Sequence, residues 1–437
     1  MPQSGPVPLA FPFAARRARH QARHQLGDEA GDEAGGPSGN SRDPSSNAAR
    51  RRRPWLVVAG GGTVGHVSPG VAIAEALIER GCPRSAIHFV GSRRGVEATR
   101  VPNAGFSVTL LPGRGVQRRL STQNIAAVVG LAVAALASLA LLIRRRPAVV
   151  LVLGGYASAP CGLAAAVLRI PIVVAEQNAV PGAANRLVGR AARACAVSFE
   201  HTDLPRAVLT GNPVRPELAG SASPAQREVA RVAARARLGV GPDRILVLAY
   251  GGSLGARTIN RAVWGAVPRW ADRGDLAVRH VVGDRGWAER PPGLGEDPAR
   301  TEPARADRLI YQPIIYEEAM AVALNAADLV VSRAGASTVS ELAAVGVAAI
   351  LVPLPIATED HQTANAKVLE GVGAAVVIAD RDLDAERLMT ELDALLATPG
   401  RLAAMGEAAR TVGRPDAADR VADLVVHHAQ RRWQEHP

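Results

Sequence analysis

The chain has 437 residues, 48% of them hydrophobic and 21% charged, which is long enough for two ordinary globular domains. Aromatic residues make up only 3%, so a base-stacking surface is poorly supplied and nucleic acid is not expected as a partner, despite a formal net charge of +11. The three widely spaced cysteines, Cys82, Cys161 and Cys195, indicate neither a disulfide framework nor a zinc site, which fits a reducing cytoplasmic setting.

Residues 1–53 are expected to form a disordered basic extension, because they mix Pro, Gly, Ser, Asp and Arg without periodicity. They hold nine arginines and five acidic residues, a net charge of +4. The remaining +7 belongs to the folded body, where it suits an anionic ligand or an acidic membrane surface. The apolar patch Val7–Phe13 precedes the arginines and is too short for a signal-peptide core.

A buried strand, Trp55–Ala59, leads into Gly60-Gly61-Gly62 and then His66, and a helix is predicted over Val71–Arg80. Glycines at a strand-to-helix turn permit positive φ and let backbone N–H groups approach a phosphate closely. The pattern is not GxGxxG and no acidic residue follows the next strand, which disfavours a nicotinamide cofactor. His66 lies in the predicted loop with no apolar face to occupy, so we interpret it as a site residue rather than a structural one.

The stretch Ile125–Ile143 holds 19 uncharged residues, enough to cross a membrane. It is dominated by alanine, however, and predicted α/β units lie directly before and after it. We therefore expect a long helix that packs on the sheet, with one face reaching into the lipid headgroups. A buried core helix is the alternative.

Polar clusters follow two buried strands of the first half. Glu176 and Asn178 come directly after the strand Pro171–Ala175, and Gly154–Pro160 follows the strand Ala148–Leu153. Because the carboxyl ends of parallel strands meet at one edge of a sheet, these clusters are expected on the ligand-binding edge.

A second unit repeats the order of the first. The strand Ile245–Tyr250 is followed by a glycine turn and a helix, after a charged segment, 216–243, that we place as the link between the halves. This organisation predicts a first domain over 54–215 and a second over 244–412. A terminal segment, 413–437, is expected to be helical and to return to the first half.

The second unit contains a strand, Leu329–Val331, then Gly335 and a helix predicted to begin near Ser337. Thr338 and Glu341 match a capping box, and the free N–H groups of this helix start suit an anion. Alternatively, Glu341 is only a cap, and the polar residues 359–362 are only a solvated turn.

Six motifs in order carry a family resemblance that covers residues 55–430. They read GGGTVGHVSPG, GGYASAP, EQNAVPG, GNPVR, GGSLGA and RAGASTVSEL with the following DHQTANA. In these motifs the chain resembles the bacterial peptidoglycan N-acetylglucosaminyltransferases that make lipid II from lipid I. The resemblance implies an α/β fold of two Rossmann-like doubly wound domains that face each other across a cleft (GT-B). It also implies a peripheral enzyme on the cytoplasmic face of the cell membrane that touches anionic lipids.

The resemblance implies that UDP-GlcNAc lies in the cleft and that the first half meets the lipid-linked acceptor. Thr63, Val64 and Gly65 resemble the loop near the diphosphate. Asn178 resembles a sugar contact, and Arg215 a contact on the nucleotide side of the cleft.

Donor contacts of the second half follow in the same way. Ser253 resembles a phosphate contact, and Ile314 or Ile315 offers backbone groups to uracil. The donor helix start resembles the run Ala336, Ser337, Thr338 to Glu341, with Glu341 on the ribose hydroxyls, and Gln362 resembles the residue that reads GlcNAc hydroxyls. Val64, Leu254 and His361 depart from the residues common in the family.

The implied reaction is inverting transfer of GlcNAc to the C4 hydroxyl of the MurNAc sugar of undecaprenyl-pyrophosphoryl-MurNAc-pentapeptide, lipid I. It needs a base for that hydroxyl and stabilisation of departing UDP. His66 can titrate near neutrality, while Glu176 could act if burial raises its pKa, and we favour His66. Helix starts and Ser253 stabilise UDP, with no cofactor and no metal-binding DxD among the motifs. The alternatives are a different acceptor, a UDP-sugar epimerase, and a non-catalytic scaffold that binds nucleotide sugars or membranes.

Overall fold

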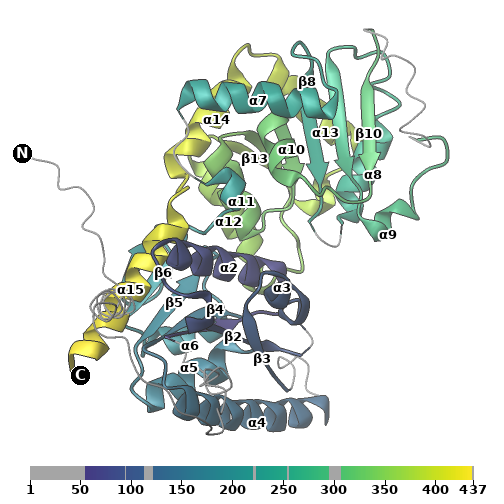
Figure 1. The fold of residues 1–437 in the computed structure, drawn as a ribbon. Coiled ribbons are helices and arrows are strands. Elements are labelled where there is room, and N and C mark those ends of the chain that lie inside the picture. The colour runs from purple at the N-terminus through teal and green to yellow at the C-terminus, as the bar shows by residue number, and fades with distance from the viewer. Residues whose placement is uncertain are drawn as a thin grey trace, which may run out of the picture.

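The computed structural model describes residues 55–93, 95–112, 122–219, 223–252, 255–294 and 307–435. Within these ranges the chain forms two α/β halves, each built on a wholly parallel sheet (Figure 1). The central strands are short, mostly apolar runs buried on both faces, which is the pattern that parallel sheets require because helices cover both sides. The expected architecture of two Rossmann-like doubly wound domains is confirmed.

The first sheet has the strand order β3-β2-β1-β4-β5-β6-β7 in the described residues. Its strands are β1 (Leu56–Gly60), β2 (Ile87–Ser92), β3 (Ser107–Leu111), β4 (Val149–Gly154), β5 (Ile172–Glu176), β6 (Ala194–Val197) and β7 (Ala207–Leu209). Its helices are α2 (Val64–Glu79), α3 (Glu97–Asn103), α4 (Thr122–Arg145), α5 (Ser158–Val167) and α6 (Ala183–Gly189), with a 3-10 turn, η2 (Arg84–Ala86). The order reverses between β1 and β4, and such a switch point opens a ligand crevice at the carboxyl ends of these strands.

The second sheet has the order β10-β9-β8-β11-β12-β13 in the part of the chain that is described. Its strands are β8 (Ile245–Tyr250), β9 (Leu276–Val281), β10 (Ile310–Ile314), β11 (Leu329–Ser332), β12 (Ala348–Leu351) and β13 (Ala375–Val377). Its helices are α7 (Pro224–Leu238), α8 (Arg257–Ala266), α9 (Asp284–Trp287), α10 (Met320–Ala326), α11 (Ala336–Val345), α12 (His361–Gly371), α13 (Ala385–Leu396) and α14 (Arg401–Val412). The 3-10 turns are η3 (Pro216–Leu218), η4 (Thr358–Asp360) and η5 (Asp380–Asp382).

Helix α7 occupies most of the segment that we expected to link the halves. Ser223 and Gln226 form a capping box at its start, and Gly239 ends it in the left-handed conformation. The helix packs on α10, and Arg231 and Arg235 bind Asp328 at 2.6 and 2.9 Å. Residues 224–238 of this segment are therefore helical, and the helix is fastened to the second half.

Helix α15 (Ala417–Glu435) crosses back and lies beside α2 of the first half, where the yellow helix meets the purple one in Figure 1. Val421, Val425 and Val426 enter the same buried apolar cluster as residues of α2 and β1. Arg80, the C-cap residue of α2, also binds Asp419 at 2.6 Å. The crossing helix thus ties the two halves together by apolar burial and an ion pair.

Helix α4 extends the predicted span at both ends. Ala134 and Leu142 are fully buried against the first sheet, whereas Leu136 is 68% exposed. None of the helices among the described residues is both long and apolar enough to cross a bilayer. Helix α4 therefore has one apolar face buried on the sheet and another that is exposed.

Candidate active site

The glycine turn after β1 leads into α2 earlier than expected. The helix begins at Val64 rather than Val71, because Gly62, at φ 94°, turns the chain directly into the first helical turn. Pro69 lies inside the helix, where it removes one hydrogen bond without stopping a helix that has already begun. Thr63, Val64 and Gly65 therefore lie at the helix start, where N–H groups have no partner within the helix and can meet an anion.

His66 lies in the first turn of α2 and not in a loop, which corrects our expectation. Its Nδ1 is 2.9 Å from Oγ1 of Thr63. When Nδ1 carries the proton and donates it to that hydroxyl, Nε2 is left as the acceptor. Burial of the ring lowers the pKa of His66, an effect that outweighs the opposing charges of Glu176 and Glu97. The imidazole is therefore neutral at pH 7 and able to take a proton.

Glu176 ends β5 and is 3% exposed. Its Oε1 accepts the backbone N–H and the Nδ2 of Asn178 at 2.9 and 3.2 Å. Its Oε2 accepts the N–H of Gly182 at 3.0 Å and Nδ2 of Asn185 at 2.8 Å. A carboxylate has about four acceptor positions, so these four donors fill them and Glu176 organises the loop that carries Asn178. This geometry favours His66 over Glu176 as the base.

Asn365 joins the two halves, and sequence reasoning missed it. The side chain is fully buried on α12, yet its Oδ1 accepts the N–H of Ala179 from the first half at 2.8 Å. Its Nδ2 donates to Oδ1 of Asn178 and to the carbonyl of Ala334, both at 3.2 Å. One amide thus holds the loop after β5 of the first half and the residues just before α11 of the second. Its place inside DHQTANA was the signal that could have found it.

Helix α11 begins at Ala336 with Gly335 as its N-cap and no side-chain cap, so the expected capping box is wrong. Glycine takes the cap position, and Glu341 turns instead to Arg215, whose Nε lies 3.0 Å from Oε1. Ser337 and Thr338 stand in the first turn, on the helix start that would face an anion.

Glu341 is a buried carboxyl with an altered pKa. Burial raises this pKa to about 7, while Arg215 lowers it and Glu217 raises it further. Burial has a larger effect on this pKa than the ion pair has. Glu341 is 5% exposed, whereas the Arg215 side chain is 43% exposed, so solvent screens its charge. Glu341 therefore titrates in the physiological range, at the place where the resemblance implies the ribose.

Gln362 and His361 open α12. Oε1 of Gln362 accepts the N–H groups of Ala334 and Leu354 at 3.2 and 3.0 Å, so its NH₂ group is the part that can donate to a sugar hydroxyl. His361 donates from Nδ1 to the carbonyl of Thr358 at 2.7 Å, which makes Nε2 the acceptor in the neutral ring. Glu359, just before them, binds Arg186 of the first half.

Ile315 follows β10 and is 38% exposed, and its carbonyl accepts the N–H of Gly283 at 3.0 Å. Ser253 and Leu254 lie outside the described residues. Of the predicted contacts, the structure brings Asn178, Gln362 and the start of α11 together through Asn365 and Ala334. Glu341 and Arg215 meet as a pair beside them.

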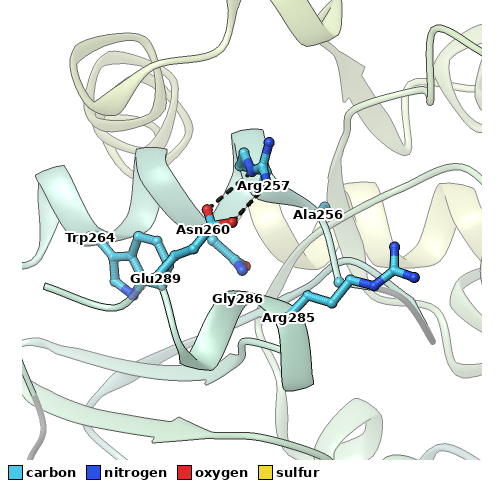
Figure 2. A pocket seen from close by; sticks show the side chains of 8 residues that line it. Ala256, Arg257, Asn260, Trp264, Arg285, Gly286 and Glu289 are labelled. Atoms are coloured by element: carbon cyan, nitrogen blue, oxygen red, sulfur yellow. Dashed lines mark hydrogen bonds and ion pairs between the residues drawn. The ribbon is translucent and has the colours of Figure 1, made fainter.

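Figure 2 shows a separate pocket of about 270 Å³ between α8 and α9. Arg257 and Glu289, which both line it, form an ion pair of 2.7 Å. None of the predicted site residues lines this pocket. Gly255 and Ala256, which follow the glycine turn after β8, lie in its lining.

Two family models cover most of the chain. The glycosyltransferase family 28 N-terminal domain matches residues 56–197, and the glycosyltransferase family 28 C-terminal domain matches residues 246–421. The boundary between them falls in the segment that contains α7.

Two curated relatives match over nearly their whole length. The UDP-N-acetylglucosamine–N-acetylmuramyl-(pentapeptide) pyrophosphoryl-undecaprenol N-acetylglucosamine transferase of Desulforudis audaxviator is 39% identical over 376 residues, 85% of this chain and 97% of that protein. The transferase of the same name from Nocardioides sp. is 40% identical over 371 residues, with the same two shares of 85% and 97%.

Solved structures agree on the architecture. Acinetobacter baumannii MurG has a TM-score of 0.65 and 28% identity, over 85% of this chain and 99% of that one. A putative UDP-N-acetylglucosamine 2-epimerase from Listeria monocytogenes, at 15% identity and a TM-score of 0.57, over 86% of this chain and 97% of its own, shares the fold alone. With two family 28 domains in order and relatives near 40% identity, the chain belongs to glycosyltransferase family 28 and, within it, to the family of these N-acetylglucosamine transferases.

Proposed function

We propose that the protein transfers GlcNAc from UDP-GlcNAc to the C4 hydroxyl of MurNAc in lipid I, with inversion, and so forms lipid II for peptidoglycan synthesis. The observation that carries this proposal is the match to transferases of that name over 97% of their length. Two observations support it: His66 of the first half interacts electrostatically with His361 of the second, and Asn365 of the second half binds Asn178 and Ala179 of the first.

The donor is proposed to bind to the second half. Glu341 accepts the ribose hydroxyls, Gln362 donates its NH₂ group to a GlcNAc hydroxyl, and backbone groups at Ile315 meet uracil. The start of α11 and Ser253 contact the diphosphate, where unpaired N–H groups favour negative charge. Arg215, which forms an ion pair with Glu341, adds a positive charge on the nucleotide side.

The transfer step then needs one base and one leaving group. Nε2 of His66 removes the proton of the acceptor hydroxyl. The hydroxyl oxygen bonds to C1 of GlcNAc from the face opposite UDP. The bond between C1 and the phosphate oxygen breaks, and UDP leaves with that electron pair. The N–H groups of Thr63, Val64 and Gly65 lie at a helix start that favours the developing charge. Asn178 is placed by Glu176 to contact the sugar.

Incubation of the purified protein with radiolabelled UDP-GlcNAc and a short-chain lipid I analogue tests this function. We expect label to move into the lipid product. Label that appears as free sugar or as another epimer would assign the protein to the epimerases, which share its fold. UDP binding without any turnover would instead favour a non-catalytic scaffold.

We also propose that residues 54–215 meet the acceptor and the cytoplasmic face of the cell membrane, while residues 244–412 hold UDP-GlcNAc. Leu136 on α4 and Val167 on α5 are 68% and 75% exposed, and these two helices pack together. Arg144 and Arg145 stand in the last turn of α4. An exposed apolar face next to arginines suits peripheral contact with anionic lipid headgroups.

Leu136→Asp combined with Val167→Asp is expected to reduce binding to vesicles that contain anionic lipid by about tenfold, because two charged groups cannot enter the headgroup region as leucine and valine do. Co-sedimentation with vesicles measures the effect. Val229→Asp is the matched control, since Val229 is 70% exposed on α7 of the second half. Equal losses from both changes would contradict a membrane face on the first half.

A further inference from the structure

A buried carboxylate stands behind the glycine turn of the first half. Glu97 opens α3 and is only 1% exposed. Its Oε2 accepts the N–H of Gly62 at 2.8 Å, and its Oε1 accepts the N–H of Ser92, at the end of β2, at 2.5 Å. One side chain therefore joins the turn after β1 to the end of the neighbouring strand.

Three glycines make room for this carboxylate. A Cβ added at Gly91 would lie 2.2 Å from Cγ of Glu97, and one at Gly95 would lie 2.0 Å from its Oε2. A Cβ at Gly61 would lie 2.4 Å from its Cδ. Neither Gly91 nor Gly95 has a positive φ, so the requirement for glycine there is space and not backbone conformation. A side chain at any of these three glycines would therefore clash with Glu97.

The bond to Gly62 determines which N–H groups remain for a ligand. The N–H of Gly62 is used by Glu97, whereas the next three, of Thr63, Val64 and Gly65, begin α2 and lack partners within the helix. The hydrogen bond to Glu97 fixes Gly62, and with it the start of α2 and His66. Glycine-rich turns are otherwise conformationally free, so an anchor of this kind reduces the entropy lost when a ligand binds.

We propose that Glu97 is a positioning residue for the transfer reaction: it locks Gly62, so that the start of α2 presents its N–H groups and His66 to the reacting groups. This role rests on the proposed function. Glu97 itself is buried behind the turn and acts through Gly62 and His66.

The charge of Glu97 adds a second, measurable effect. The groups that act on His66 are Glu97 from α3, Glu176 from β5 and His361 from the start of α12. The two carboxylates raise the pKa of His66 and His361 lowers it. Removing the charge of Glu97 therefore lowers the pKa of His66 further. Because a base works in its neutral form, the acidic limb of the pH–rate profile moves to lower pH.

Glu97→Gln is the first test, measured as kcat/KM for the lipid I analogue at saturating UDP-GlcNAc from pH 4.5 to 9. The amide keeps the size of the side chain but places an NH₂ group against one of two N–H donors. We expect a loss of about 10- to 100-fold, as for a misplaced catalytic group, together with the shift of the acidic limb to lower pH. UDP-GlcNAc binding to the second half, measured by calorimetry, should change less than threefold.

Glu75→Gln is the matched control for this substitution. Glu75 lies on α2 of the same half and pairs with Arg84 at 2.8 Å on the surface. Its loss should leave both kcat/KM and the pH profile unchanged. A reduced rate with an unmoved acidic limb in Glu97→Gln would indicate a merely structural carboxylate and overturn the proposal.

A double-mutant cycle gives a test that does not depend on how well Glu97→Gln folds. Gly95→Ala should displace the carboxylate and reduce kcat/KM by about tenfold in the native background, yet cause little further loss in a Glu97→Ala background. Additive losses would mean that Gly95 serves something other than Glu97, and would overturn the proposal. Native protein that transfers no label at all would instead disprove the proposed function, so the two failures remain distinguishable.

Discussion

His66→Ala is expected to reduce kcat by about 10²- to 10⁴-fold and to leave the dissociation constant of UDP-GlcNAc nearly unchanged. The reason is that His66 is a neutral imidazole at the start of α2, whereas the donor contacts belong to the second half. Single-turnover kinetics with the lipid I analogue and calorimetry with UDP-GlcNAc separate the two quantities. The native profile should also fall on the acidic side, where the imidazole becomes protonated.

His201→Ala is the control, because His201 is an exposed histidine of the same half. It should retain the native rate. Near-normal turnover of His66→Ala would show that His66 is not the base and would leave Glu176 as the candidate base. Glu176→Gln alone is not decisive, since that carboxylate also holds the loop of Asn178 through four hydrogen bonds.

UDP-GlcNAc is expected to bind about tenfold more tightly at pH 8 than at pH 6, because Glu341 accepts ribose hydroxyls best as a carboxylate. With a pKa of about 7, raised by burial, this group is mostly protonated at pH 6 and mostly ionised at pH 8. UDP-GlcNAc itself has no titrating phosphate in this range. Calorimetry at pH 6, 7 and 8 measures the change.

Glu341→Gln should weaken UDP-GlcNAc binding at pH 8 by about 10- to 100-fold and abolish the pH dependence, since the amide does not titrate. Glu370→Gln, at an exposed position on α12 of the same half, should bind as the native protein does. If the pH dependence survives in Glu341→Gln, another group is responsible and the ribose assignment is wrong.

Much of the fold could be predicted from the sequence because its signals are local. Continuous apolar runs such as Ala148–Leu153 and Ile245–Tyr250 predicted strands buried on both faces, and they lie in wholly parallel sheets. Polar loops after those strands were expected at one edge, and parallel strands require this. Glycine turns after β1 and β8 indicated two similar halves, since the residues near a turn decide its conformation.

The tertiary structure decided which residues, far apart in the sequence, bind one another at those loops. Local spacing predicted a capping box for Glu341, but the carboxyl turns to Arg215, which is far away in sequence. Asn365 reaches Asn178 across 187 positions, and Glu97 reaches Gly62 across 35. Residue patterns describe the neighbours of a side chain along the chain. The partners of a buried polar group depend instead on which elements the packed sheets bring together, since burial without a hydrogen bond costs free energy.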